Sequence, residues 1–203
     1  MTTVERMVEI LTVCTGNICR SPLAEQLLRV SLEPLGATVH SAGTMGLDAA
    51  PMTTEAQRLA LDLGVPGEMA AAHRSRYLTE RELDSPDLIL AMSREHRRRI
   101  VELAPSRLRS TFTVREFARL AEPVPDDEIR AAAGAAGADA AARLRAAASA
   151  VAAQRGMIAP PTDAADDDVI DPYRRSWETY ERSAAQLVPA IAQVARVVAV
   201  ALG

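Results

Sequence analysis

Lysine is absent from this chain, and aromatic side chains are scarce. All 23 basic residues are arginine, and 27 acidic residues outnumber them, so the net charge is -4. An acidic chain lacks the positive excess that binding along a nucleic acid backbone needs, and we expect no nucleic acid partner. Only 3% of the residues are aromatic while 48% are hydrophobic, which predicts a core of aliphatic side chains.

Cysteines and long apolar runs are also few. Two cysteines cannot form a disulfide scaffold, which favours a reducing compartment. The apolar run at 8–13 is too short for a signal peptide. The run at 184–203 contains glutamine, proline and arginine, as an amphipathic core helix does. We therefore expect a cytoplasmic protein without a membrane partner, and the oligomeric state is left open.

Strand-like and helix-like segments alternate along most of the chain. Short β-rich runs predict strands at 8–13, 38–42, 87–92 and 110–114. Apolar spacing and capping residues predict helices at 22–35, 53–63, 79–83, 93–103, 115–121 and 177–202. This alternation predicts an α/β fold whose parallel sheet binds its ligand at the carboxyl ends of the strands. The length favours a single domain, 1–203.

Residues 122–165 interrupt this alternation with a sequence rich in alanine and bounded by prolines. We predict an insertion that forms either a helical hairpin or one long helix between proline-rich hinges. Two charge runs lie on either side of it: a basic run at 94–99, which includes His96, and an acidic run at 166–168. We expect both runs to be solvated, the usual setting of such runs.

The sequence VCTGNICRSP at 13–22 joins the first predicted strand to the first predicted helix. Ser21 is the predicted N-cap, and Pro22 suits the first helical position. Such a loop presents free N–H groups to an anion, and Gly16 lets it curl without a Cβ clash. Arg20 adds a fork that fits two oxygens of a phosphate. The same field is expected to lower the pKa of Cys14, so that its thiolate can attack phosphorus.

This loop and a second motif, DPY at 171–173, resemble the low-molecular-weight protein tyrosine phosphatase family and its arsenate reductase relatives. The segments SAGT at 41–44, HRSR at 73–76 and DLILAM at 87–92 follow in the family's order. The resemblance covers 7–120 and 166–202. It implies a flavodoxin-like fold, with a four-stranded parallel sheet and helices on both faces. It also implies hydrolysis of phosphorylated proteins or small aryl phosphates through a phosphocysteine, with no cofactor and no metal.

The resemblance further implies roles for individual residues. Cys14 is the expected nucleophile, Arg20 binds phosphate and stabilises the transition state, and Asp171 is the general acid that protonates the leaving oxygen. The expected phosphate-binding residues are Thr15, Gly16, Asn17, Ile18, Cys19 and Arg20. The residues expected to support the loop through hydrogen bonds are Asn17, Ser21, Ser41 and His73.

The chain departs from the family at the rim of the substrate cleft. Leu47 stands where an aromatic wall is common, and it is a predicted substrate wall together with Tyr173. Arg174 occupies the position of a frequent second aromatic residue, and Ser93 that of a frequent aspartate. These departures leave the phosphoryl chemistry intact but weaken the expectation that phosphotyrosine is the preferred substrate.

Several alternatives stay open at this point. Cys19 either fills space beneath the loop or also acts as a resolving thiol that forms a reversible disulfide with oxidised Cys14. Arsenate reduction with an external thiol would use the same loop, whereas a phosphoprotein-binding module would keep the loop without turnover. Ile18, Pro22 and the DPY motif favour the phosphatase.

Overall fold

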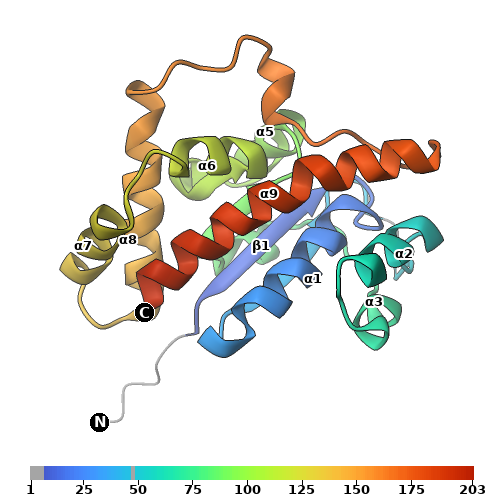
Figure 1. Ribbon diagram of the computed structural model, residues 1–203, viewed down its shortest axis with the longest axis horizontal. Coiled ribbons are helices and arrows are strands. Elements are labelled where there is room, and N and C mark those ends of the chain that lie inside the picture. The colour runs from blue at the N-terminus through green and yellow to red at the C-terminus, as the bar shows by residue number, and fades with distance from the viewer. Residues whose placement is uncertain (1–6, 47–48) are drawn as a thin grey trace.

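The sheet sets the position of every other element. The computed structural model describes residues 7–46 and 49–203 (Figure 1). Four parallel strands are ordered β2-β1-β3-β4, with bounds β1 Glu9–Cys14, β2 Thr38–Gly43, β3 Leu88–Ala91 and β4 Thr111–Thr113. Their carboxyl ends meet at one edge, where Cys14 pairs in register with Gly43. The predicted four-stranded parallel fold with helices on both faces is confirmed.

Helices cover both faces of this sheet. Ile10 and Cys14 of β1 belong to the larger core, whereas Leu11 and Val13 belong to a second, smaller core on the other face. Such alternation is expected of a strand buried on both sides. Helices α1, α6 and α9 lie over the larger core (Figure 1). The bounds are α1 Arg20–Leu32, α2 Thr54–Asp62, α3 Gly67–Ala72, α4 Glu80–Asp84, α5 Arg94–Leu103, α6 Val114–Ala121, α7 Asp126–Ala135, α8 Ala140–Ala153 and α9 Trp177–Leu202.

Helix α1 begins earlier than expected and is capped differently. It starts at Arg20 with Cys19 as its N-cap residue, and no side chain caps it. The prediction that Ser21 is the N-cap is wrong, because Ser21 lies inside the first turn and its hydroxyl contacts Cys14. Pro22 also lies in the first turn rather than at its first position, where its missing N–H still costs no helical hydrogen bond.

Two other helices begin at residues whose side chains cap them. The Thr53 and Ser93 side chains accept hydrogen bonds from the first turns of α2 and α5. Helix α3 was not predicted, because its segment GEMAAA is short and buries only Ala70. The predicted helix at 22–35 ends at Leu32, and a 3-10 turn follows it.

Residues 122–165 contain a helical hairpin, one of the two predicted arrangements. Helices α7 and α8 pack against each other and against α9 (Figure 1). Ile129 of α7 and Leu144 of α8 are fully buried in the larger core. After α8 the chain passes 3-10 turns at 154–156 and 164–167 and returns to the start of α9 (Figure 1). The hairpin therefore extends the core that lies on the sheet.

Helix α9 is the longest helix that the structure describes. By length and composition it is able to cross a membrane, but the core helix of a globular protein passes the same test. Its stripe of Leu187, Ile191, Val194 and Val198 is buried in the larger core, against α1, α6 and α8. This packing is the one expected of an amphipathic core helix.

The acidic run at 166–168 is not fully solvated, so that prediction is wrong for two of its residues. Asp167 pairs with Arg119 at 2.8 Å, and Asp168 pairs with Arg94 at 3.0 Å. One carboxylate oxygen of Asp168 also accepts the backbone N–H of Arg94 at the start of α5. The reason is tertiary, since the run crosses a helix N-terminus that favours carboxylates.

Candidate active site

The loop at 15–19, which we call the cradle, connects β1 to α1 at the carboxyl edge of the sheet. Its turn depends on Asn17, whose φ of 55° is left-handed, a conformation that asparagine tolerates better than most residues. The side-chain nitrogen of Asn17 donates to the hydroxyls of Ser21 and Ser41 at 2.9 and 2.7 Å. Its side-chain oxygen accepts the backbone N–H of Arg76 at 2.8 Å. Both expected supporting serines thus contact Asn17.

The glycine on which the cradle depends sterically lies outside it. A Cβ at Gly43, the last residue of β2, would lie 2.6 Å from the carbonyl oxygen of Thr15 and 3.0 Å from the nitrogen of Asn17. A Cβ at Gly16 would meet only the flexible Ile18 side chain, at 3.4 Å. The expectation that Gly16 is needed for the curl is therefore wrong, because the left-handed residue is Asn17 and the close backbone approach is at Gly43.

Cys14 ends β1 at the base of the cradle, and it is 2% exposed. Its Sγ lies 3.0 Å from the Ser21 hydroxyl and accepts the backbone N–H of Asn17 at 3.3 Å. The two contacts fix the sulfur at the entrance to α1. The position next to a helix N-terminus is one in which an attacking thiolate is commonly found.

Arg20 brings a guanidinium to the same place from the first turn of α1. One terminal nitrogen donates to the carbonyl of Val169 at 3.1 Å, and the other lies 2.7 Å from a carboxylate oxygen of Asp171. The buried Nε has no hydrogen-bond partner among the described residues. An orphaned buried donor is costly, and an oxyanion in the cradle would satisfy it.

Cys14, Arg20 and Asp171, the expected nucleophile, phosphate-binding residue and acid, line one pocket of about 220 Å³. Its lining residues are Cys14, Thr15, Gly16, Ile18, Cys19, Arg20, Met45, Asp171 and Tyr173. Tyr173 is 41% exposed at this pocket, and Met45 is a wall that the sequence did not indicate. Leu47, the other predicted wall, lies outside the described residues. A larger groove of about 1090 Å³ between α1 and α3 is lined by neither Cys14 nor Arg20.

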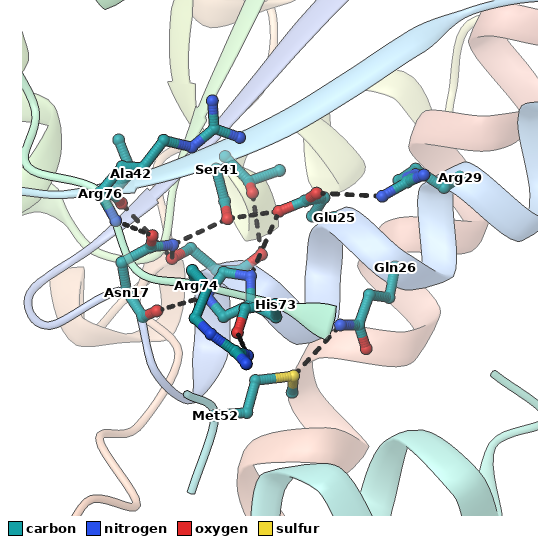
Figure 2. Close-up of polar contacts among 12 residues, drawn as sticks. Asn17, Glu25, Gln26, Arg29, Ser41, Ala42, Met52, His73, Arg74 and Arg76 are labelled. Carbon is teal, nitrogen blue, oxygen red and sulfur yellow. Dashed lines mark hydrogen bonds and ion pairs between the residues drawn. The ribbon is translucent and has the colours of Figure 1, made fainter. Parts of the chain in front are cut away.

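His73 and Glu25 belong to a network of polar contacts that includes Asn17 of the cradle (Figure 2). One ring nitrogen of His73 lies 2.8 Å from the carbonyl oxygen of Asn17, and the other lies 3.9 Å from Glu25. Glu25 in turn accepts a hydrogen bond from Ser41, which links back to Asn17 (Figure 2). Burial lowers the pKa of His73. Sequence reasoning missed Glu25, which is buried in α1. The signal was its position on the apolar side of the predicted helix, where an unpaired carboxylate would be costly.

His96 is a further residue that sequence reasoning missed. The basic run at 94–99 was predicted to be solvated, yet His96 is 5% exposed. Its two ring nitrogens lie 2.8 Å from the Thr15 hydroxyl and 2.9 Å from the Ser93 hydroxyl. Burial and the nearby Arg20 guanidinium lower the pKa of His96 to about 4. The prediction is therefore wrong for this residue, which contacts the cradle as a neutral imidazole.

Cys19 is the last residue of the cradle, and it is buried. Its sulfur is 3.6 Å from the Thr53 hydroxyl and 3.7 Å from the Tyr180 hydroxyl. Burial raises the pKa of Cys19 to about 11, so this thiol stays protonated. These contacts agree with the space-filling interpretation, and the resolving-thiol role stays a prediction.

Within the described part of the chain, no group of three or more His, Cys, Asp or Glu side chains could hold a metal ion. The pocket brings together a thiol, a guanidinium and a carboxyl group, which are the groups expected to act as nucleophile, oxyanion-binding fork and acid.

A family model, related sequences and solved structures all indicate the same protein family. The sequence model of the family "low molecular weight phosphotyrosine protein phosphatase" matches residues 9–127. The Escherichia coli K12 protein Etp, a low molecular weight protein-tyrosine-phosphatase, is 46% identical over 96 residues, which cover 47% of this chain and 62% of that protein. A protein-arginine-phosphatase from Geobacillus stearothermophilus is 38% identical over 108 residues, covering 53% of this chain and 70% of the relative.

A solved structure extends the likeness beyond the matched sequence. The low molecular weight protein tyrosine phosphatase from T. tengcongensis is 26% identical, with a TM-score of 0.63 over 92% of this chain and 97% of that one. The likeness therefore includes the C-terminal region, where Asp171 lies. On the family match and these relatives, the chain belongs to the low molecular weight phosphotyrosine protein phosphatase family.

Proposed function

We propose that this chain hydrolyses phosphomonoesters through a phosphocysteine at Cys14. The observation that carries the proposal is a buried cysteine and a buried guanidinium in one pocket, where the Nε of Arg20 lacks a protein partner among the described residues. A phosphate dianion would accept hydrogen bonds from Arg20 and from N–H groups of the cradle.

The reaction has two steps. The Cys14 thiolate attacks phosphorus while the bond to the leaving oxygen breaks, and Asp171 gives its proton to that oxygen. Water then attacks the phosphocysteine, Asp171 takes a proton from the water, and the S–P bond breaks to release phosphate. Arg20 stabilises the negative charge of the transferring group in both steps. The 2.7 Å contact between Arg20 and Asp171 keeps the acid beside the phosphate-binding group.

We propose that the substrate is an aryl phosphate, with phosphotyrosine in proteins as the first candidate. The pocket walls include Ile18, Met45 and Tyr173, which suit an aromatic ring. Relatives named protein-arginine-phosphatase make phosphoarginine the second candidate. A phosphoarginine guanidinium would need a carboxylate partner. Among the described lining residues the one acidic side chain is Asp171, which is already paired with Arg20.

The decisive experiment compares wild-type protein with Cys14→Ser on p-nitrophenyl phosphate, a phosphotyrosyl peptide and a phosphoarginyl protein. We expect wild type to hydrolyse the first two, and we expect Cys14→Ser to lose turnover while still binding inorganic phosphate. Turnover by Cys14→Ser above a trace would contradict the covalent mechanism. Binding without wild-type turnover would indicate a phosphoprotein-binding module, and arsenate reduction with an added thiol would indicate a reductase.

We further propose that 1–203 is one phosphatase domain with an insertion at about 122–165. Phosphorylated proteins in the cytoplasm are the proposed partners. Nucleic acid and membranes are not, because the charge of -4 and the buried stripe of α9 favour neither.

A further inference from the structure

The first turn of α5 contacts both halves of the candidate site. Arg94, at the first position of the helix, contacts the segment that leads to Asp171. His96, two residues later, contacts Thr15 in the cradle. The proposed acid and the cradle lie far apart in the sequence. Because α5 contacts both, it can influence the distance and orientation between them.

On the acid side, Asp168 is fixed by several donors. Its Oδ1 accepts the backbone N–H of Arg94 at 2.7 Å, and the Arg94 side chain donates to both of its oxygens, at 3.0 to 3.3 Å. The carbonyl of Asp168 accepts from Arg115 at 2.8 Å. The next residue, Val169, donates to the carbonyl of Met92 at 2.8 Å. The acid segment is thus held against the carboxyl edge of the sheet three residues before Asp171.

On the cradle side, the imidazole of His96 lies between two hydroxyls. Ser93, the N-cap of α5, contacts one ring nitrogen at 2.9 Å, and Thr15 contacts the other at 2.8 Å. Arg20 in turn donates to the Thr15 hydroxyl at 3.4 Å. The His96 ring is therefore linked through Thr15 to the guanidinium that pairs with Asp171.

We propose that the first turn of α5 places the general acid relative to the nucleophile, with Arg94 and His96 as positioning residues. The inference rests on the proposed phosphatase function, in which Asp171 is the acid. Arg94 holds the acid segment through Asp168, and His96 holds Thr15 and thereby the cradle. Neither side chain touches the reacting atoms.

A purely structural ion pair is the competing explanation. The Arg94 side chain is 49% exposed and that of Asp168 is 26% exposed. Exposed ion pairs contribute little to stability. A role in stability alone would slow all substrates together, in proportion to the protein that unfolds. A role in placing the acid would instead slow most the substrates whose leaving oxygen needs a proton.

The test measures turnover of phenyl phosphate and p-nitrophenyl phosphate by Arg94→Ala, Asp168→Asn and the control Arg98→Ala. Arg98 lies on the same helix and pairs only with Glu95 and Glu102 among the described residues. We expect Arg94→Ala and Asp168→Asn to slow phenyl phosphate about tenfold more than p-nitrophenyl phosphate, a part of the about 100- to 10,000-fold effect of a positioned acid. Inhibition by inorganic phosphate should be unchanged in both variants.

His96→Ala tests the cradle side of the proposal. We expect it to slow both esters by the same factor and to weaken inhibition by inorganic phosphate, because the cradle rather than the acid is disturbed. The same ester ratio as in Arg98→Ala for both acid-side variants would overturn the inference while leaving the proposed function intact. Wild-type protein that hydrolyses neither ester would overturn the proposed function and this inference together. If Arg94→Ala does not fold, the ester ratio of Asp168→Asn, which keeps the shape of the side chain, tests the inference by itself.

Discussion

At the scale of single residues, the contact between Arg20 and Asp171 determines where the proposed acid lies. The Arg20 guanidinium is buried, whereas the Asp171 side chain is 50% exposed. One Asp171 oxygen pairs with Arg20, and the other accepts the backbone N–H of Tyr173 at 3.2 Å. The carboxyl is thus held at the mouth of the pocket but remains accessible to a leaving group.

Replacing the proposed acid should have an effect that depends on the leaving group. Asp171→Asn cannot donate a carboxyl proton, and a phenolate needs that proton more than a nitrophenolate does. We expect phenyl phosphate turnover to fall by about 100- to 10,000-fold and p-nitrophenyl phosphate turnover to fall far less. The measurement is kcat for both esters, with the exposed neighbour Asp166→Asn as the control. Equal losses on both esters in Asp171→Asn would assign the proton donor to another group.

At the scale of elements, the site forms where the ends of β1 and β2 meet the start of α1. Gly43 ends β2 so close to the cradle that a Cβ would lie 2.6 Å from the Thr15 carbonyl oxygen. Since that contact is with backbone rather than a flexible side chain, the loop itself must shift to admit even a methyl group.

Gly43→Ala should therefore damage the cradle. We expect it to lower the free energy of unfolding by about 1–3 kcal/mol, as overpacking does, and to weaken binding of inorganic phosphate. The control is Gly134→Ala inside α7, where no described atom outside the adjacent backbone of the helix lies within 4 Å of the added methyl group. That change should stabilise the protein by about 0.5–1 kcal/mol and leave phosphate binding unchanged. Urea unfolding and phosphate titration check both variants, and normal phosphate binding by Gly43→Ala would refute the steric argument.

At the scale of the whole molecule, the α7–α8 hairpin and the sheet share one core. Leu144 is fully buried and belongs to the same cluster as Ile10 of β1 and Val194 of α9. A hairpin that shares its core with the sheet should unfold together with it.

Leu144→Ala tests this coupling. We expect one cooperative urea transition in both proteins, with the free energy of unfolding lowered by about 2–5 kcal/mol in the variant. Far-UV circular dichroism and the fluorescence of Trp177, the single tryptophan, should report the same midpoint. The control is the exposed Leu108→Ala, which should change stability little. Two separate transitions would show that the hairpin folds independently.

Stability should also fall in acid through His96. Its pKa is about 4 in the folded chain and near 6.5 when unfolded, so the unfolded state binds the extra proton between these values. This contribution is complete above pH 6.5 and is lost as the pH falls toward 4, by up to about 3 kcal/mol.

His96→Gln should flatten this dependence. The slope of unfolding free energy against pH between 6.5 and 4 should decrease in the variant, as measured by urea unfolding at several pH values. Some slope should remain, because burial also lowers the pKa of His40 and His73. Parallel curves for the two proteins would mean that His96 does not contribute.

The sequence by itself determined the local structure and the chemistry of the loop. Alternating strands and helices predicted the parallel sheet, and the cradle pattern placed Cys14 and Arg20 together, because a short strand–loop–helix unit is fixed by nearby residues. The capping residue Ser93 could be identified for the same reason.

Only the tertiary structure decided which side chains from other parts of the sequence lie around the candidate site. Glu25, His96 and Asp168 read as parts of charged helix faces or runs, yet each is drawn to the carboxyl edge of the sheet by partners from other elements. Asp171 reaches Arg20 in the same way. Likewise Gly43, not Gly16, is the glycine that the cradle requires, because a close approach between two strands' ends depends on sheet register, which no local pattern encodes.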